Sequence, residues 1–381
     1  MKNLDQAHNY INDVTEKNLD RVFSLVQDLY DHPEVGGQEV HAHQVLTDYL
    51  ENLGFSIERN LVMDTAFRAT YQGQAPKPGP TIALMAEYDA LPGIGHGCGH
   101  NLIQGFSLLA ATALKDLIDE TGGSLQVLGT PAEENFGGKV HMAEAGLFDT
   151  VDAALMIHPS TKNGLGALSS ALYPLKFEFF GKTAHGCKPQ EGASALDAAV
   201  MTYTAIQFQR QFMGKDCFIH GIIKNGGEAA NVIPGYASLE YYFRAPTMKE
   251  AQAMAEDATK RAQAMADATG TTMKTSIYEC PYGDTLPSIS LAEYMREAMT
   301  AEGIEDIEDF DWTIGGSTDV GAVSYKCPTL QANLKIAESD VLGHSVEMAQ
   351  ATVSDVGKKA LLDGAMALAK LSYRLLTDPA A

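Results

Sequence analysis

Apolar residues recur at helical spacing near the start of the chain and then give way to short apolar runs. Periods of three and four residues predict helices over residues 4–30 and 40–53, and Gly54 ends the second one. A longer helical pattern covers residues 102–118. Short apolar or alternating runs predict strands over residues 55–59, 66–71, 81–85, 124–128 and 153–157. Alternating strands and helices of this kind predict an α/β core.

The pattern changes near residue 172 to the order strand, helix, strand, strand, helix, strand. The predicted elements are residues 175–180, 194–212, 218–224, 236–244, 248–268 and 272–279. This βαββαβ order is typical of a ferredoxin-like module. We therefore expect residues 172–283 to form a domain inserted into a discontinuous domain of residues 1–171 and 284–381.

The last part of the chain returns to the first domain in this prediction. It is expected to contain a helix, a glycine-rich turn, a strand and a final helix, at residues 291–302, 315–319, 329–334 and 352–376. A length of 381 residues with 45% hydrophobic content is consistent with two globular domains.

The charge of the chain limits its partners. The 49 acidic residues outnumber the 27 basic ones, and the formal net charge of −22 opposes binding to nucleic acid or to an anionic membrane. Residues 1–20 lack the apolar run of a secretory signal, and no later run is long enough to span a bilayer. Five cysteines without a CxxC spacing argue against a disulfide framework, so a cytoplasmic protein is expected.

Residues 86–101 combine carboxylates, a thiol and imidazoles in a glycine-rich stretch after an apolar strand. Cys98 and His100 are two residues apart, and the glycines between and around them let both side chains converge on one ion. On this motif alone, a tight turn with a buried cysteine and a hydrogen-bonded histidine is an equally good interpretation. The roles of Glu87, Asp89 and His96 in the same stretch stay open, with a structural or supporting role favoured for His96.

Other candidate groups also follow predicted strands. Glu133 and Glu134 come after strand 124–128, where adjacent carboxylates repel each other unless a cation lies beside them. One could bind a metal ion while the other accepts a proton from water, although a solvated acidic loop is the alternative. His158 ends strand 153–157. Since ligands bind at the carboxyl ends of strands in open α/β sheets, these groups are expected to converge.

The inserted module carries one further candidate. Arg244 lies on a strand face with Glu240, and its guanidinium could bind a carboxylate with a second hydrogen bond from Asn231. A surface salt bridge to Glu240 is the alternative. His185 and His344 carry little signal by themselves.

Taken together, seven ordered segments resemble the metallohydrolase family of aminoacylase-1, carboxypeptidase G and the indole-acetyl-amino-acid hydrolases. The segments are DALP at 89–92, HGCGH at 96–100, PAEE at 131–134, IHP at 157–159, GKTAH at 181–185, NVIP at 231–234 and FR at 243–244. Asn101 and residues 316–321 are similar to the branch of aminoacylase-1-like protein 2 and p-aminobenzoyl-glutamate hydrolase.

The resemblance implies a zinc-peptidase-like catalytic domain with a central, mostly parallel sheet and an inserted ferredoxin-like dimerisation (lid) domain. It implies two divalent ions per subunit, Mn²⁺ or Zn²⁺, with a thiolate ligand that favours zinc although members of this branch are often manganese enzymes. The implied metal ligands are Cys98, His100, Glu134, His158 and His344.

The resemblance also implies the reaction. Glu133 would be the general base for a water activated by two metals, and His185 from the partner subunit of a homodimer would contact the oxyanion. Asn231 and Arg244 would hold the substrate carboxylate, in a pocket lined by residues Gly316, Ser317 and Thr318.

The expected activity is hydrolysis of the amide bond of an N-acyl amino acid or dipeptide-like substrate with a free carboxylate. A dipeptidase that requires a free amino end is the alternative within enzymes. A metal-free carboxylate-binding protein that keeps the fold is the alternative from another class. The sequence does not identify the acyl group.

Overall fold

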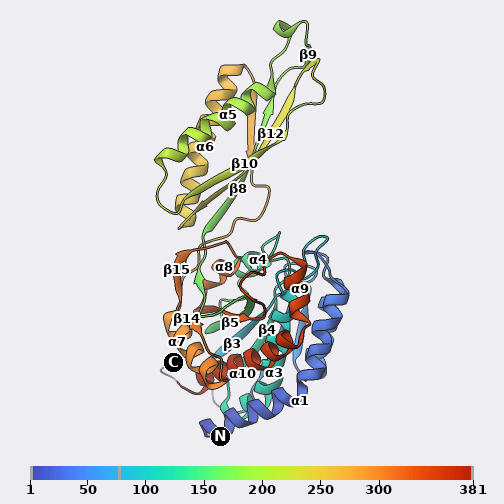
Figure 1. Cartoon of the computed structure of the whole chain (residues 1–381), viewed down its shortest axis with the longest axis vertical. Coiled ribbons are helices and arrows are strands. Elements are labelled where there is room, and N and C mark those ends of the chain that lie inside the picture. Colours follow the sequence, from blue (N-terminus) through green and yellow to red (C-terminus); the bar gives the residue numbers. More distant parts are fainter. Residues whose placement is uncertain (1–2, 76–78, 379–381) are drawn as a thin grey trace. The chain divides into compact units, whose positions relative to one another are not determined.

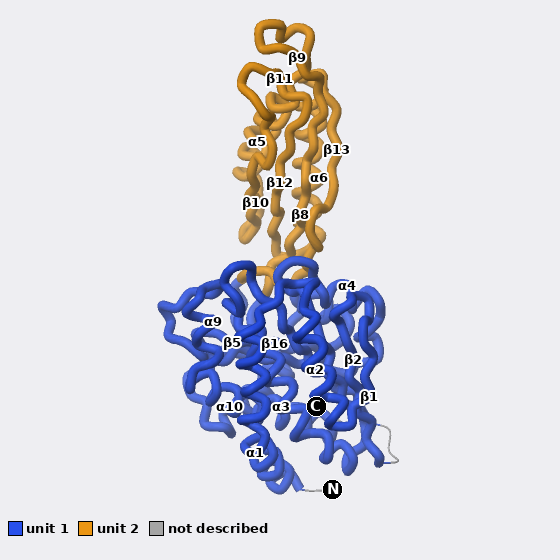
Figure 2. The backbone as a smooth tube through the Cα atoms, turned by 90° about the vertical axis from the view of Figure 1, so that its right-hand side faces the viewer, with its two compact units in different colours: residues 1–168, 285–313, 319–381 blue, residues 169–284, 314–318 orange. Residues whose placement is uncertain are grey.

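The computed structural model describes residues 3–75 and 79–378 and divides the chain into two compact units. Unit 1 contains the described residues of 1–168, 285–313 and 319–381, and unit 2 contains residues 169–284 and 314–318 (Figure 2). None of the helices in the described part of the chain is long and apolar enough to cross a membrane.

Unit 1 is built on a mixed sheet of eight strands in the order β1-β2-β4-β3-β5-β16-β6-β14. Its strands are β1 (Ser56–Arg59), β2 (Phe67–Gln72), β3 (Thr81–Ala86), β4 (Ser124–Gly129), β5 (Ala153–Ser160), β6 (Asn163–Gly164), β14 (Ile307–Glu308) and β16 (Thr329–Lys335). The central neighbours β4, β3, β5 and β16 pair in parallel, whereas β1 with β2 and β2 with β4 are antiparallel. This arrangement confirms the predicted, mostly parallel α/β sheet.

Helices cover both faces of this sheet. They are α1 (Leu4–Asp31), α2 (Val40–Asn52), α3 (His100–Thr121), α4 (Gly138–Glu144), α7 (Ile289–Ala301), α8 (Val320–Ser324), α9 (Val346–Thr352) and α10 (Asp355–Thr377), with α1, α3 and α10 packed together (Figure 1). Ile82 and Leu84 of β3 join the core that contains these three helices. Ala83 and Met85 join a second core with α4 and α8. A strand buried on both faces is apolar throughout, which explains why β3 is read so clearly from the sequence.

Unit 2 is a four-stranded antiparallel sheet in the order β10-β12-β8-β13. The elements follow the order β8 (Ala171–Phe180), α5 (Ala195–Gln209), β10 (Phe218–Asn225), β12 (Tyr236–Ala245), α6 (Met248–Thr269) and β13 (Thr272–Ser276). This confirms the predicted βαββαβ fold. Helices α5 and α6 lie side by side along the sheet (Figure 1), and Phe177, Leu239 and Phe243 of the sheet form a buried core with their alanines.

Some element boundaries differ from the sequence prediction. The helix expected over residues 352–376 is α10, which begins at Asp355 because Ser354 caps it by accepting a hydrogen bond from the Gly357 backbone N at 3.1 Å. The short helix α9 before it was not expected. Helix α5 passes into the 3₁₀ turn η2 (Arg210–Phe212), and a second 3₁₀ turn is η1 (Pro189–Glu191). Short strands in loops carry too little pattern to be recognised: β7 (Ala167–Leu168), β9 (Ala184–His185), β11 (Val232–Ile233) and β15 (Asp311–Ile314).

Candidate metal centre

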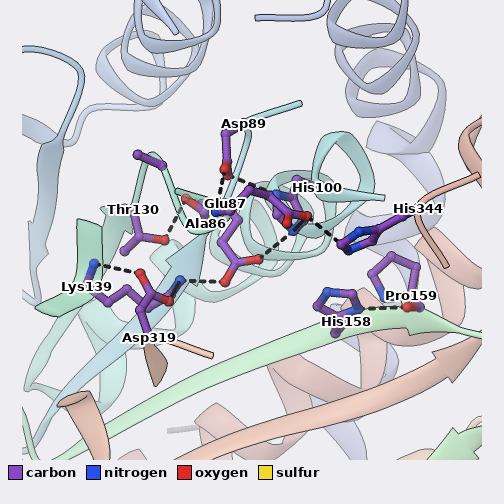
Figure 3. A network of polar contacts seen from close by, with 12 residues as sticks. Ala86, Glu87, Asp89, His100, Thr130, Lys139, His158, Pro159, Asp319 and His344 are labelled. Carbon is purple, nitrogen blue, oxygen red and sulfur yellow. Dashed lines mark hydrogen bonds and ion pairs between the residues drawn. The ribbon is translucent and has the colours of Figure 1, made fainter. Parts of the chain in front are cut away.

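The carboxyl ends of three parallel strands and the start of α3 bring polar side chains together in unit 1. Glu87 and Asp89 follow β3, Glu133 and Glu134 follow β4, His158 lies near the end of β5, Cys98 and His100 lie at the start of α3, and His344 lies in the loop before α9. Figure 3 shows Glu87, Asp89, His100, His158 and His344 around one region.

Cys98 belongs to two groups of potential metal ligands. The first group is Cys98, His100 and His158, and the second is Cys98, Glu134 and His344. Within each group all ligand atoms lie within 4.8 Å of one another. His344 has a left-handed backbone with φ 59° and a side chain that is 58% exposed. The five residues expected to hold metal are therefore close enough to form two neighbouring sites that share the thiol.

The turn before α3 depends on Gly99, which lies between the two ligands Cys98 and His100. Its φ of 82° is in the left-handed region, where a side chain is unfavourable. A Cβ atom at this position would lie 2.4 Å from the Cγ atom of Pro159. The next residue, Asn101, ties the start of α3 to Thr352 of α9 through a 2.9 Å hydrogen bond from Nδ2 to Oγ1.

Buried hydrogen bonds orient the histidines of the centre. His100 Nδ1 lies 2.9 Å from Asp89 Oδ1 and donates to it, since a carboxylate oxygen only accepts. Asp89 Oδ2 accepts from the backbone N of Glu134 at 3.0 Å. His158 Nδ1 donates to the carbonyl oxygen of Pro159 at 2.7 Å (Figure 3). Both rings therefore keep Nε2 available as a metal ligand.

Three buried polar atoms at the centre have no hydrogen-bond partner among the described residues: Glu87 Oε2, His100 Nε2 and Glu134 Oε1. His100 Nε2 lies 3.3 Å from Glu87 Oε2 and 3.9 Å from Glu134 Oε1, and His344 Nε2 lies 3.6 Å from Glu134 Oε1. Buried polar atoms are normally paired, and a divalent cation would pair all three. A thiol, imidazoles and carboxylates in this arrangement fit zinc or manganese.

Burial and charge shift the pKa values at the centre. Burial raises the pKa of the Cys98 thiol to about 12, so a thiolate there requires a cation beside it. Burial alone would lower the pKa of His100, but the carboxylates of Asp89 and Glu87 outweigh it and hold that pKa well above its usual value. Burial, together with the charges of Glu87 and Asp319, raises the pKa of Glu133 well above its usual value. Such a carboxyl group is suited to accept and return a proton.

Two residues beside the centre were missed by the sequence prediction. Lys139 of α4 is fully buried and its Nζ atom lies 2.5 Å from Glu87 Oε1 and 2.7 Å from Asp319 Oδ1 (Figure 3). A buried lysine requires such negatively charged partners. In the sequence, Asp319 was noted only as part of a glycine-rich turn. His96, in contrast, belongs to none of the potential ligand groups among the described residues, and its Nε2 atom lies 3.0 Å from the carbonyl oxygen of Leu29.

The residues expected to contact substrate fall in two separate places within unit 2. His185 pairs with Val232 between strands β9 and β11, and the preceding Asn231 accepts a hydrogen bond from Gly186 N through its carbonyl oxygen at 2.8 Å. Arg244 lies at the far end of β12, a strand of 10 residues. At about 3.3 Å per residue this strand is roughly 30 Å long. Arg244 and Asn231 of one chain therefore do not reach the same carboxylate.

Arg244 has partners other than the one weighed from the sequence. Its Nη1 atom donates to Ser317 Oγ at 2.7 Å, and its Nε atom donates to His220 Nε2 at 3.2 Å. Glu240 pairs instead with Lys224, at 3.3 Å. The segment of residues 314–318, which contains Gly316 and Thr318, belongs to unit 2 with Arg244. The guanidinium therefore lies beside the segment expected to line the substrate pocket.

A comparison with known families decides the broader assignment. The model of peptidase family M20/M25/M40 matches residues 83–361 of this chain. The chain belongs to this family. As a member it is a metallohydrolase of amide or peptide bonds, which confirms the expected class of enzyme.

Relatives within the M20 family cover nearly the whole chain. The human Xaa-Arg dipeptidase is 36% identical over 94% of this chain and 86% of its own length. A p-aminobenzoyl-glutamate hydrolase polypeptide of Escherichia coli is 32% identical over 79% of this chain and 66% of its own length. A solved structure of a dinuclear metal binding M20 peptidase from Bacillus subtilis has a TM-score of 0.70 at 21% identity, covering 95% of this chain and 99% of the other.

Proposed function

We propose that this M20 hydrolase is a dipeptidase that uses two divalent ions to cleave the amide bond before a C-terminal residue. The observation that carries the proposal is the clustering of thiol, imidazole and carboxylate ligand atoms within 4.8 Å of one another beside Glu133. The similarity to the human and mouse Xaa-Arg dipeptidases over almost the full chain supports a dipeptide as substrate, and an unmodified dipeptide carries a free amino end.

Five residues would hold the ions. Cys98, His100 and His158 form one ligand group, and Cys98, Glu134 and His344 form the other. When bound, two divalent ions polarise the scissile carbonyl group and lower the pKa of water. The soft thiolate favours zinc, and the carboxylate and imidazole ligands are also compatible with manganese.

Glu133 is proposed as the general base. Burial, together with the charges of Glu87 and Asp319, raises its pKa, and a carboxyl group with a raised pKa is suited to take up and return a proton. Glu133 would take a proton from the attacking water at a carboxylate oxygen and return it to the leaving amine. Asp89 would keep His100 and the Glu134 backbone in place during this exchange, since it contacts both.

The proposal includes a homodimer with a composite site. Arg244, beside Ser317, would hold the substrate carboxylate. Because Asn231 and His185 lie beyond the other end of β12, they would serve the active site of the other subunit. His185 of the partner subunit would then donate a hydrogen bond to the carbonyl oxygen as it becomes negative.

An exposed edge strand supports dimerisation through unit 2. Strand β10 lies at the edge of its sheet and carries three exposed apolar side chains, Phe218, Ile222 and Ile223. Exposed Phe208 and Phe212 come from the end of α5 and from η2. Soluble proteins rarely leave an apolar edge strand uncovered, and a second copy of the strand would extend the sheet.

A second candidate function is hydrolysis of an N-acyl amino acid. It is favoured by the 32% identity to the p-aminobenzoyl-glutamate hydrolase polypeptide. The two candidates share a scissile amide next to a free carboxylate. They differ at the other end of the substrate, where only a dipeptide carries a charged amine.

A substrate panel separates the candidates. Protein loaded with Zn²⁺ or Mn²⁺ would be incubated with Xaa-Arg and other dipeptides, their N-acetylated forms, and p-aminobenzoyl-glutamate. Products would be followed by mass spectrometry, with a chelator-treated control. The proposal predicts chelator-sensitive cleavage of free dipeptides and little cleavage of their acetylated forms, and the reverse preference would establish the second candidate.

Metal analysis of the same protein addresses the non-catalytic alternative. A carboxylate-binding protein without metals would show neither turnover nor stoichiometric zinc or manganese after dialysis. If protein with two bound ions cleaves none of the tested compounds, these compounds are rejected as substrates, but the assignment of the metal centre stands.

A further inference from the structure

Two histidines and an aspartate form a further group of potential metal ligands in unit 1. Asp28 lies in the last turn of α1, His32 caps the end of that helix, and His41 is the second residue of α2. One ligand atom from each residue lies within 4.8 Å of the other two. This group shares no residue with the groups that contain Cys98 or His100, so it is a separate candidate site.

Each oxygen of the Asp28 carboxylate contacts a different imidazole ring. Oδ2 lies 2.7 Å from His41 Nε2, and Oδ1 lies 3.2 Å from His32 Nδ1. The centroids of the two rings are 5.0 Å apart, and their planes meet at 57°. For one tetrahedral zinc ion, two ligand atoms are roughly 3.3 Å apart and the centroids of two imidazole ligands are roughly 5 Å apart. The three side chains therefore have nearly the spacing that a shared ion requires.

The contacts of the group are hydrogen bonds that an ion can replace. His41 Nε2 donates to Asp28 Oδ2, and His32 Nδ1 donates to the backbone carbonyl oxygen of Asp28 at 2.9 Å. A neutral imidazole carries one proton, which either ring nitrogen can hold. When the proton moves to the other nitrogen of each ring, both facing nitrogens present a lone pair beside an ionised carboxylate. Two imidazoles and one carboxylate then bind a divalent ion without a net loss of protons.

The backbone holds the group in place from both sides. The backbone N of His32 donates to the carbonyl oxygen of Asp28 at 3.0 Å, so the two residues are one helical turn apart. Glu34 follows two residues later, and its carboxylate accepts from the backbone N atoms of His41 and Ala42 at 2.9 Å each. The start of α2 is therefore fixed against the segment that leaves α1, and little backbone order has to be gained when an ion binds.

We propose that Asp28, His32 and His41 form an additional zinc site, with water completing the coordination. Two imidazoles and a carboxylate suit zinc, and the side chains of His32 and His41 are 61% and 39% exposed, which leaves access for the ion and for water. The ion would join the end of α1 to the start of α2 and stabilise unit 1 against unfolding. The site takes no part in the proposed reaction and does not depend on it.

Removal of one imidazole tests the site. Zinc alone would be titrated by calorimetry into chelator-treated protein without an added histidine tag, as wild type, His41→Ala and the control His141→Ala. The control also removes an exposed imidazole beside one carboxylate, that of Glu144 at 3.9 Å. His41→Ala should weaken one zinc site by at least about tenfold and leave the others unchanged, because even residues behind a ligand contribute that much. Equal zinc binding in wild type and His41→Ala would overturn the inference.

A second pair of variants separates a ligand from a general attraction of zinc to negative charge. Asp28→Asn removes the shared carboxylate, whereas Asp31→Asn removes a neighbouring one that accepts from Gln27 Nε2 at 3.1 Å and lies outside the ligand group. A ligand role predicts weaker zinc binding in Asp28→Asn only. The same loss in both variants would contradict the site.

Anomalous scattering at the zinc edge locates the ion directly. Crystals of wild type grown with zinc should show a peak among Asp28, His32 and His41, and crystals of His41→Ala should not. Peaks confined to the candidate metal centre would overturn the inference. A peak at these three residues without any difference between wild type and His41→Ala in the titration would reduce the site to an adventitious ion only.

Discussion

At the scale of single residues, some buried carboxylates near the candidate centre hold the backbone in place and are not proposed metal ligands. Glu39 is one that the sequence did not single out. Its Oε1 atom accepts from Ala132 N at 2.8 Å, and its Oε2 atom accepts from Thr65 Oγ1 at 2.9 Å. Ala132 has a left-handed backbone with φ 60° directly before Glu133. Glu39 therefore holds the turn that presents the proposed general base.

Burial raises the pKa of Glu39 to about 7 from a usual 4.5, which predicts a pH-dependent stability. Between these values the folded protein keeps a proton that the unfolded chain has lost, so stability falls as the pH rises through this window. Glutamine mimics the protonated acid and does not titrate. The stability of Glu39→Gln relative to wild type should therefore rise by about 3 kcal/mol from about pH 4.5 to above pH 7.

Urea unfolding of chelator-treated wild type and Glu39→Gln at several pH values measures this difference. If the difference in unfolding free energy between the two proteins does not change with pH, Glu39 is ionised in the folded protein at every pH tested.

At the scale of elements, the sequence predicted those helices and strands whose apolar residues recur at a regular spacing. Strand β3 was expected over residues 81–85 and spans Thr81–Ala86, because both of its faces are covered. Helix α9 was not predicted, because its 7 residues are too few to show a helical period, whereas the helix expected over residues 352–376 corresponds to α10.

The candidate site likewise contains residues that the sequence predicted and residues that it did not predict. Cys98, His100 and Glu134 stand in recognisable motifs, and the structure places them together. Lys139 and Glu39 were not predicted, because a buried partner from another element leaves no periodic signal in its own segment.

The junction before α3 gives an element-scale prediction. Gly99→Ala places a Cβ atom 2.4 Å from Pro159 Cγ at a φ of 82°. Gly303, after α7, has a similar φ of 74° but open space around it. Gly303→Ala should therefore cost only the backbone strain, about 1–2 kcal/mol, whereas Gly99→Ala should cost more.

Gly99→Ala should also weaken metal binding, because it displaces both Cys98 and His100. Thermal unfolding and zinc titration of the two variants check this comparison. Equal destabilisation with unchanged zinc affinity would show that the junction tolerates a side chain.

At the scale of the whole molecule, the account requires two subunits. Asn231 and Arg244 are separated within one chain by the length of β12, so the proposal that both residues hold one carboxylate requires two chains. The spacing of thirteen residues could not predict this separation, because it says nothing about direction until the strand is known. The composite site of a homodimer was expected only from the family resemblance.

The edge strand β10 supplies a test of dimerisation. Ile222→Lys adds a charge to an exposed edge position and should convert the proposed dimer to monomers. The matched control is Ile277→Lys, because Ile277 is similarly exposed but follows β13 at the opposite edge of the sheet. Sedimentation analysis should show monomers for the first variant only. Dimers in both variants would place the contact elsewhere.

A mixing experiment tests the composite site. His185→Ala and Glu133→Gln subunits should each have little activity, because each lacks a proposed catalytic group. A mixed dimer contains one intact site out of two, and random exchange of equal amounts makes about half of the dimers mixed. Mixing should therefore restore roughly a quarter of the wild-type activity per site. Absence of any recovery after confirmed subunit exchange would place His185 in its own subunit's site or outside the reaction.

The central claim is that Glu133 acts as a base beside a metal centre built by its neighbours, and Glu133→Gln tests it most directly. Turnover and metal content would be measured on the same preparation, with wild type alongside. The account predicts a loss of at least about 10² to 10⁴ in kcat with two ions still bound. Turnover that survives the change, or ions lost with it, would contradict the assigned role.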